Sequence, residues 1–328
     1  MTKEINDTGY GAHGTFYPDS LFGTEVQMPY SGIRTFMRRR PTHGLEGVDY
    51  AIYGIPFDMS TSGRSGARLG PSALREASLQ LSWGQVWPWN IDPFDTLAVI
   101  DYGDVNFRRG QVESMIENAV ETARKIIDAD AGTIMMGGDH ATTYTALKAH
   151  AEKHGPLALI QFDAHRDTQE SDYFDHGTFV HHAIKEGLID PEHSIQIGIR
   201  TFYEKNDPMH VLYRDWLHEH GWQGALEKIR DVVGDRKAYM TIDIDSVDPA
   251  FAPGTGTPVV DGLHPNEILS IIRKTGDLDI VGMDLVEVAP PYDTAGITAL
   301  LGASMILEFF CSRAAQKQKG ITGTTTNV

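Results

Sequence analysis

Residues 157–167 read Leu-Ala-Leu-Ile-Gln-Phe-Asp-Ala-His-Arg-Asp, an apolar run that passes directly into a group of potential metal ligands. The first six residues are nearly all apolar, which is typical of a strand covered on both faces. Side chains at positions i, i+2 and i+4 of an extended chain point the same way. Asp163, His165 and Asp167 can therefore face one site. The stretch predicts a buried strand of a parallel sheet with a polar site at its carboxyl end.

Similar apolar runs alternate with helical segments along most of the chain. Segment 112–127 carries apolar side chains at spacings of three and four residues, as an amphipathic helix does. Segment 70–77 has a proline in its first turn, which is typical of a helix start. Strands alternating with helices favour an α/β fold, with a mainly parallel sheet covered on both faces. The predicted strands are 48–56, 97–100, 133–136, 157–162, 195–199, 238–242 and 280–283.

Two further segments with ligand-type side chains follow predicted strands, residues 137–140 (Gly-Gly-Asp-His) and 243–245 (Asp-Ile-Asp). Ligands of open parallel sheets bind beyond the carboxyl ends of the strands, so these side chains are expected to converge. Dense carboxylates repel one another unless cations neutralise them. The pattern predicts a two-metal hydrolytic site. The candidate metal ligands are His140, Asp163, His165, Asp167, Asp243 and Asp245.

The types of ligand also indicate the metal. Aspartate and histidine without a thiolate favour Mn²⁺, with Ni²⁺, Co²⁺ or Fe²⁺ as alternatives. The formal net charge of the chain is −17, which argues against a nucleic-acid partner because such a protein needs a basic face. The charge suits a small cationic substrate, and it is equally compatible with a role in solubility alone.

Composition and length suit a globular protein, because 41% of the 328 residues are hydrophobic and 22% are charged. Residues 1–45 are expected to form an N-terminal arm on the domain or on a neighbouring subunit, or else a loosely ordered leader. Residues 46–318 are expected to form a single catalytic domain, and residues 319–328 a flexible tail. The N-terminus lacks a signal-peptide core and no apolar stretch approaches about 18 residues, so a cytoplasmic location without membrane contact is expected. The single cysteine, Cys311, excludes an internal disulfide and is expected to be buried.

Four blocks of this sequence resemble the signature motifs of the ureohydrolase family, which comprises arginases, agmatinases and their relatives. The resemblance extends from about residue 48 to 315, and its most specific block is Asp-Ile-Asp-Ser-Val-Asp-Pro-Ala-Phe-Ala-Pro-Gly-Thr-Gly-Thr-Pro at 243–258. Segments 57–66, 87–90, 174–178 and 187–191 are more similar to bacterial agmatinases than to arginases. The four signature blocks are 137–140, 163–168, 243–258 and 286–290.

The resemblance implies a three-layer α/β/α fold of the arginase/deacetylase type and a dimanganese centre. One ion would be held by His140, Asp163, Asp167 and Asp243, and the other by Asp163, His165, Asp243 and Asp245. Asp163 and Asp243 would bridge the two ions.

The resemblance also implies the roles of the side chains around the metals. An activated water would attack a guanidinium carbon and release urea. His176 and Asp167 would be catalytic, with His176 carrying a proton to the departing amine. Glu287 would hold the guanidinium group in a forked pair, which carboxylate chemistry independently favours. Most relatives carry a smaller polar residue where this chain has Arg166. Alternation along the strand turns Arg166 away from the metals, so a structural ion pair is expected there.

Agmatine is the expected substrate, cleaved to putrescine and urea. Loops 169–178 and 201–210 should shape the pocket, and the first carries Glu170, Asp172 and Asp175 beside two aromatic residues. Such a wall suits a cationic tail better than a carboxylate. The alternatives are another guanidine (4-guanidinobutyrate, an alkylguanidine or a biguanide) with manganese or nickel, a non-catalytic subunit of a mixed oligomer, and a dimetal phosphoesterase. A homo-oligomer, trimeric or hexameric, is expected from the family's habit.

Overall fold

One continuous sheet forms the centre of the protein. The structure, a computed structural model, describes residues 20–24, 26–202 and 208–322. In this part of the chain the strand order is β1-β3-β2-β4-β9-β8-β5-β6-β7, and every neighbouring pair is parallel. The strands are β1 Arg40–Pro41, β2 Tyr50–Gly54, β3 Val99–Asp104, β4 Gly132–Met136, β5 Ala158–Phe162, β6 Ile195–Ile199, β7 His210–Tyr213, β8 Ala238–Asp243 and β9 Ile280–Val286.

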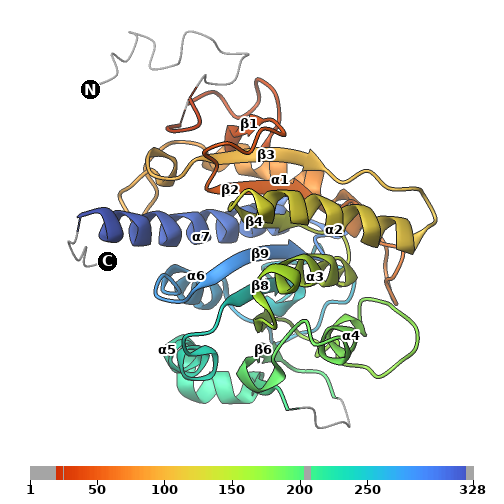
Figure 1. The fold of residues 1–328 in the computed structure, drawn as a ribbon. Helices are drawn as coiled ribbons and strands as arrows, with labels where there is room; N and C mark the ends of the chain where they lie inside the picture. The colour runs from red at the N-terminus through yellow and green to blue at the C-terminus, as the bar shows by residue number, and fades with distance from the viewer. Residues whose placement is uncertain (1–19, 25, 203–207, 323–328) are drawn as a thin grey trace.

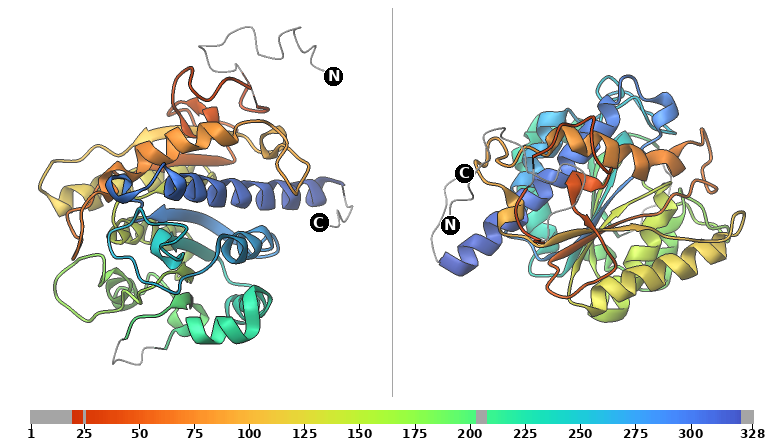
Figure 2. Two further views of the ribbon diagram at one scale, coloured as in Figure 1. Left: turned by 180° about the vertical axis from the view of Figure 1, so that it is seen from behind. Right: turned by 90° about the horizontal axis from the view of Figure 1, so that it is seen from above.

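Helices cover both faces of this sheet, which confirms the predicted three-layer α/β/α fold (Figures 1 and 2). Helices α2, α3 and α4 pack side by side on one face, and α1, α7, α6 and α5 form a second row on the other. The expected starts at Gly70 and Val112 are both found. The helices are α1 Gly70–Ser78, α2 Val112–Asp128, α3 Thr143–His154, α4 Phe179–Lys185, α5 Arg214–Val233, α6 Pro265–Arg273 and α7 Ile297–Thr322.

The strand order brings the predicted site together. Strands β4, β9, β8 and β5 are consecutive neighbours in the middle of the sheet. The segments that carry the candidate ligands and Glu287 follow these four strands. Because all four run in parallel, their carboxyl ends lie at one edge of the sheet. Residues far apart in the sequence therefore become neighbours through sheet topology alone.

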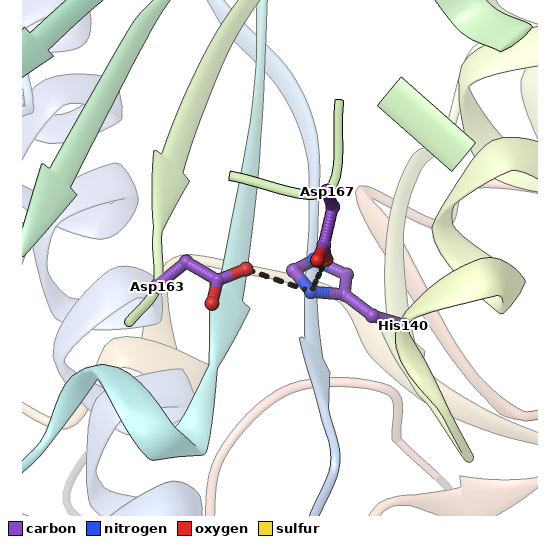
Figure 3. A group of neighbouring side chains, drawn as sticks. All are labelled: His140, Asp163 and Asp167. Carbon is purple, nitrogen blue, oxygen red and sulfur yellow. Dashed lines mark ion pairs between the residues drawn. The ribbon is translucent and has the colours of Figure 1, made fainter. Parts of the chain in front are cut away.

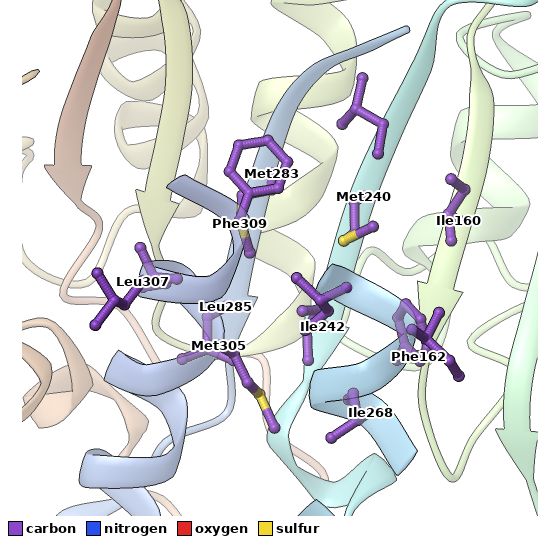
Figure 4. Close-up of a cluster of buried hydrophobic side chains, with 14 of the residues drawn as sticks. Ile160, Phe162, Met240, Ile242, Ile268, Met283, Leu285, Met305, Leu307 and Phe309 are labelled. Carbon is purple, nitrogen blue, oxygen red and sulfur yellow. The ribbon is translucent and has the colours of Figure 1, made fainter. Parts of the chain in front are cut away.

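The core between the sheet and α7 explains the strongly apolar C-terminal sequence. Met305 and Phe309 of α7 lie among the side chains of β8 and β9, including Met240 and Leu285 (Figure 4). The expectation that no long apolar stretch exists does not hold for α7, which is long and apolar enough to cross a membrane. However, 83% of its apolar window is buried inside the protein, so core packing accounts for its composition. Cys311 is buried in the same layer, as predicted.

Two segments were not foreseen as strands. Strand β1 extends the sheet beside β3, just after Phe36 and Met37, whose side chains are buried in the core. The second half of the expected N-terminal arm thus packs on the domain, whereas residues 1–19 lie outside the described residues. Strand β7 is the opposite edge strand and is mostly half-buried or exposed. An edge strand of this kind lacks the continuous apolar run that identified the central strands.

Candidate metal centre and active site

The six candidate metal ligands meet beyond the carboxyl ends of β4, β5 and β8. Five of them form two groups, and within each group the ligand atoms all lie within 4.8 Å of one another. The first group contains His140, Asp163 and Asp167 (Figure 3), and the second contains Asp163, His165 and Asp245. Asp163 belongs to both groups, as a ligand between two ions must.

The first group is centred on one imidazole nitrogen. Nδ1 of His140 lies 3.0 Å from Asp163 Oδ2, 3.1 Å from Asp167 Oδ2 and 3.2 Å from Asp243 Oδ2. In the second group, Nδ1 of His165 lies 3.0 Å from Asp245 Oδ2. Asp243 is thus placed beside the first group, and its Oδ1 accepts a hydrogen bond from the backbone N–H of Asp245 at 2.8 Å. The structure therefore brings all six predicted ligands together.

The hydrogen bonds of His140 test whether this cluster fits a metal ion. The Thr241 hydroxyl donates to Asp284 Oδ1 at 2.6 Å. Its oxygen is then the acceptor for Nε2–H of His140, 2.9 Å away. This leaves Nδ1 as the lone-pair nitrogen of a neutral ring. Nδ1 is buried, has no hydrogen-bond partner and faces three carboxylate oxygens. A lone pair among anionic oxygens is repulsive unless a cation lies between them, so the residues present fit a divalent ion.

The titration of the cluster indicates the same need for positive charge. Burial would lower the pKa of His140, but the Asp163, Asp167 and Asp243 carboxylates around its Nδ1 raise that pKa well above the usual value. Burial and then repulsion from Asp163 raise the pKa of Asp167 to about 6. Burial and repulsion from Asp245 raise the pKa of Asp243 well above its ordinary range. Divalent cations relieve both the repulsion and the burial penalty.

Next to the cluster, His176 is held between two groups. Its Nδ1 lies 2.9 Å from Glu287 Oε1. Its Nε2 meets the backbone N–H of Ser62 at 2.9 Å and the Ser62 hydroxyl at 2.8 Å. The amide can donate to a neutral ring, and the hydroxyl oxygen can accept from an imidazolium. Ser62 therefore supplies a partner for either protonation state, as a group that carries protons requires.

Glu287 is placed by the backbone beyond β9. Its N–H donates to Gly138 O at 2.8 Å, and its φ of 61° lies in the left-handed region that side-chain-bearing residues rarely adopt. Oε1 accepts from the His140 backbone N–H at 3.0 Å as well as from His176. Oε1 thus has two partners within the protein. The forked pair between Glu287 and a guanidinium stays a prediction.

The Phe57–Gly66 loop forms part of the site, a role that the sequence did not indicate. Its Ser60 hydroxyl donates to Asp139 Oδ2 at 2.7 Å, and Ser62 contacts His176. The loop lies directly against Gly138, where a Cβ would stand 1.5 Å from Phe57 O. Only glycine permits this approach. The second glycine of the Gly-Gly-Asp-His block, Gly138, is the one sign in the sequence of this close approach. Nothing in the sequence indicated that the approaching segment is the loop at Phe57.

A cavity of about 240 Å³ opens over the cluster. The predicted acidic wall does not line its described part, because Glu170, Asp172 and Asp175 are absent from the lining. Asp175 instead accepts a hydrogen bond from the Gly177 N–H at 2.9 Å. Residues 203–207 of the second predicted loop lie outside the described residues. The lining residues are Ser62, His165, Arg166, Asp167, Thr168, Gln169, His176, Gly177, Thr201, Phe202, Asp243 and Thr257.

Two imidazoles and four carboxylates at the edge of a parallel α/β/α sheet define a centre for two divalent metal ions. Comparisons with known proteins agree with this class. The family model described as the Arginase family matches residues 48–311. A curated relative named Agmatinase, from Chromobacterium violaceum, is 46% identical over 95% of this chain and 97% of its own length.

Solved structures give the same result. A hypothetical agmatinase from Burkholderia thailandensis has a TM-score of 0.91 and 47% identity, covering 96% of this chain and 99% of that one. Proclavaminate amidino hydrolase from Streptomyces clavuligerus has a TM-score of 0.83 and 40% identity, covering 88% and 99%. The chain belongs to the Arginase family, as its sequence motifs predicted. It is a metal-dependent ureohydrolase with a binuclear centre.

Proposed function

We propose that this enzyme hydrolyses agmatine to putrescine and urea with two Mn²⁺ ions. The observation that carries the chemistry is the position of Glu287, whose carboxylate stands beside the ligand cluster and next to His176. This is where a planar cation can be held against activated water. The choice of agmatine is supported by the relative named Agmatinase that matches 95% of the chain.

The six clustered side chains would hold the metals. His140, Asp163, Asp167 and Asp243 are proposed for one ion, and Asp163, His165, Asp243 and Asp245 for the other. Divalent ions held there would lower the pKa of water to about 7 and so supply a nucleophile for the unreactive guanidinium carbon. Aspartate and histidine ligands without a thiolate favour Mn²⁺ and also accept Ni²⁺.

The roles of the remaining residues follow from their contacts. Glu287 holds the guanidinium group through Oε2, because Oε1 already accepts from His140 and His176. His176 carries a proton to the departing amine. Burial would lower the pKa of His176, but the hydrogen bond to Glu287 raises it to about 9, so the ring can supply a proton at neutral pH. Ser62 stabilises the ring before and after the transfer.

Another guanidine is the second candidate substrate. In the described part of the chain, the acidic side chains that line the cavity are Asp167 and Asp243, both proposed metal ligands. Gln169, Thr168 and Thr201 offer neutral polar contacts to the far end of a substrate. A guanidine whose far end is neutral or short is compatible with these neutral lining residues. The 40% identity to a proclavaminate amidino hydrolase is a further reason to test other tails.

A substrate panel tests the proposal. Urea release should be measured with agmatine, arginine, 4-guanidinobutyrate, guanidine and a dimethylbiguanide, on protein reloaded with Mn²⁺ and, separately, with Ni²⁺. We expect kcat/KM for agmatine to exceed every other value by at least about tenfold, because a cationic tail suits a chain of net charge −17. A clear preference for another compound would overturn the choice of substrate and leave the hydrolytic chemistry intact.

Three further features are proposed with the function. Residues 46–318 form the catalytic domain, with residues 1–45 as an arm and 319–328 as a tail. The enzyme works in the cytoplasm as a homo-oligomer, either a trimer or a hexamer. Its partner is a small guanidino compound, and it requires neither nucleic acid nor a membrane.

A further inference from the structure

A chain of buried amide side chains lies directly beneath the ligand cluster. Gln161 of β5 and Gln196 of β6 are partners in the register of the sheet, and both are fully buried. Nε2 of Gln161 donates to Asp163 Oδ2 at 2.8 Å. Nε2 of Gln196 donates to Gln161 Oε1 at 2.8 Å. A proposed bridging ligand is therefore bonded to the first of two linked amides.

The other end of this chain is Arg166. Its Nε donates to Gln196 Oε1 at 2.9 Å, and its carbonyl oxygen accepts from Gln196 Nε2 at 2.6 Å. Arg166 is buried and also lines the active-site cavity. The partner of its Nε is a neutral amide, and the ion pair expected for Arg166 stays a prediction. The unusual arginine of the ligand block is thus connected to the metal centre through two side chains.

The direction of these bonds is fixed. Arginine only donates, and a carboxylate only accepts, so each amide must turn its oxygen toward Arg166 and its NH₂ toward Asp163. A flipped Gln161 would place its carbonyl oxygen against the Asp163 carboxylate. Chains of aligned hydrogen bonds also strengthen one another in a low-dielectric interior. Asp163 and Arg166, at the two ends of the chain, therefore fix the orientation of both amides.

We propose that Arg166, Gln196 and Gln161 are positioning residues that hold Asp163 in its metal-bridging orientation. This proposal rests on the proposed metal centre. The backbone N–H of His165 already fixes Asp163 Oδ1 at 2.7 Å, and Gln161 fixes Oδ2. With both oxygens held, the carboxylate presents its remaining lone pairs to the two ligand groups. Residues that orient metal ligands in this way commonly contribute 10–100-fold to metal affinity.

The test uses variants that keep side-chain volume and remove the donor, Gln161→Met, Gln196→Met and Arg166→Met. Thr133→Val is the matched control, because Thr133 is equally buried in the sheet and its hydroxyl bonds only to His150 among its given contacts. Each purified protein is stripped of metal, and Mn²⁺ affinity is measured by competition with a chelator. Circular dichroism checks the fold.

We expect Gln161→Met and Gln196→Met to weaken Mn²⁺ binding by about 10–100-fold, and Arg166→Met by a smaller factor of the same sign. Thr133→Val should bind like the wild type. The double variant Arg166→Met/Gln161→Met should bind no more weakly than Gln161→Met alone, because the chain is already broken. If Gln161→Met does not fold, the prediction is tested with Gln196→Met alone, because Gln196 is bonded to Gln161 rather than to the ligand itself.

Each other outcome has a distinct meaning. Wild-type affinity in both glutamine variants would overturn the positioning role. Full additivity in the double variant, or a change in KM for Arg166→Met without a change in Mn²⁺ affinity, would make Arg166 a residue of the cavity wall only. A wild-type protein that binds no divalent metal would instead refute the proposed metal centre, and this result is visible before any variant is made.

Discussion

Asp245→Ala should bind fewer than two divalent ions per chain and lose urea release by at least about 10³-fold, a change of ~4 kcal/mol or more in the activation free energy. Asp245 Oδ2 is 3.0 Å from His165 Nδ1 and accepts from the Thr257 hydroxyl at 3.2 Å. Its Oδ1 accepts from the Ala164 N–H at 3.1 Å. Alanine therefore removes a metal ligand and also loosens the loop that carries Asp163. Metal content by elemental analysis and urea release measure the two effects separately.

Asp248→Ala is the control for this variant. Asp248 lies three residues further along and accepts from the Ala250 and Gly262 backbone N–H groups at 2.9 and 3.0 Å, so it stabilises a turn rather than the cluster. It should keep two ions and most of its activity. Asp245→Ala protein that retained two ions and full turnover would remove Asp245 from the ligand set.

Glu287→Gln should lower kcat/KM by about 10²–10⁴-fold while both metal ions stay bound. The substitution keeps the shape of the side chain and removes its charge. The guanidinium then loses its anionic partner, and the His176 ring loses the group that raises its pKa to about 9. Glu287 is not one of the proposed metal ligands, and its contact with the ligand His140 is only to the backbone N–H. Metal content should therefore not change.

The pH dependence of kcat distinguishes Glu287→Gln from a variant that has only lost a substrate contact. His176 donates a proton, so activity falls as the pH rises through the pKa of the ring. Removing the negative charge of Glu287 lowers that pKa, and the alkaline limb of the kcat profile should move to lower pH. Glu308→Gln is the control, because Glu308 is also a buried carboxylate but bonds to Trp89 and Arg273 far from the cluster. It should lose stability and keep both the activity and the profile. An unchanged profile in Glu287→Gln would contradict the role of the His176–Glu287 pair.

The central strands and all six clustered ligands were predictable because both depend on short-range patterns. A fully buried parallel strand such as β5 is nearly all apolar, and the ligands follow it at once in the sequence. Convergence then follows from the shared direction of the strands. The edge strand β7 lacked this pattern because one side of it is not covered. His176 could be identified only through resemblance to a family, whereas Glu287 also lies just past the predicted strand 280–283.

The residues that support the ligands could not be predicted, because their partners are distant in sequence. Gln161 lies in an otherwise apolar run. Its proposed role depends on a hydrogen bond from Gln196, which is 35 residues away in the sequence. Thr241 gains a role only from Asp284 on the neighbouring strand. Ser62 meets His176 across 114 residues. The acidic loop 170–175 was expected to face the substrate because of its composition. Its Asp175 is used in a local turn instead, a contact that composition does not reveal.

Anomalous X-ray scattering from crystals grown with MnCl₂ tests the central claim most directly. Data collected above and below the manganese absorption edge locate each ion without reference to activity. The account predicts two anomalous peaks per chain, one among His140, Asp163 and Asp167 and the other among Asp163, His165 and Asp245, which are the two groups that the fold assembles. A single peak, or manganese bound elsewhere with this cluster left empty, would contradict it.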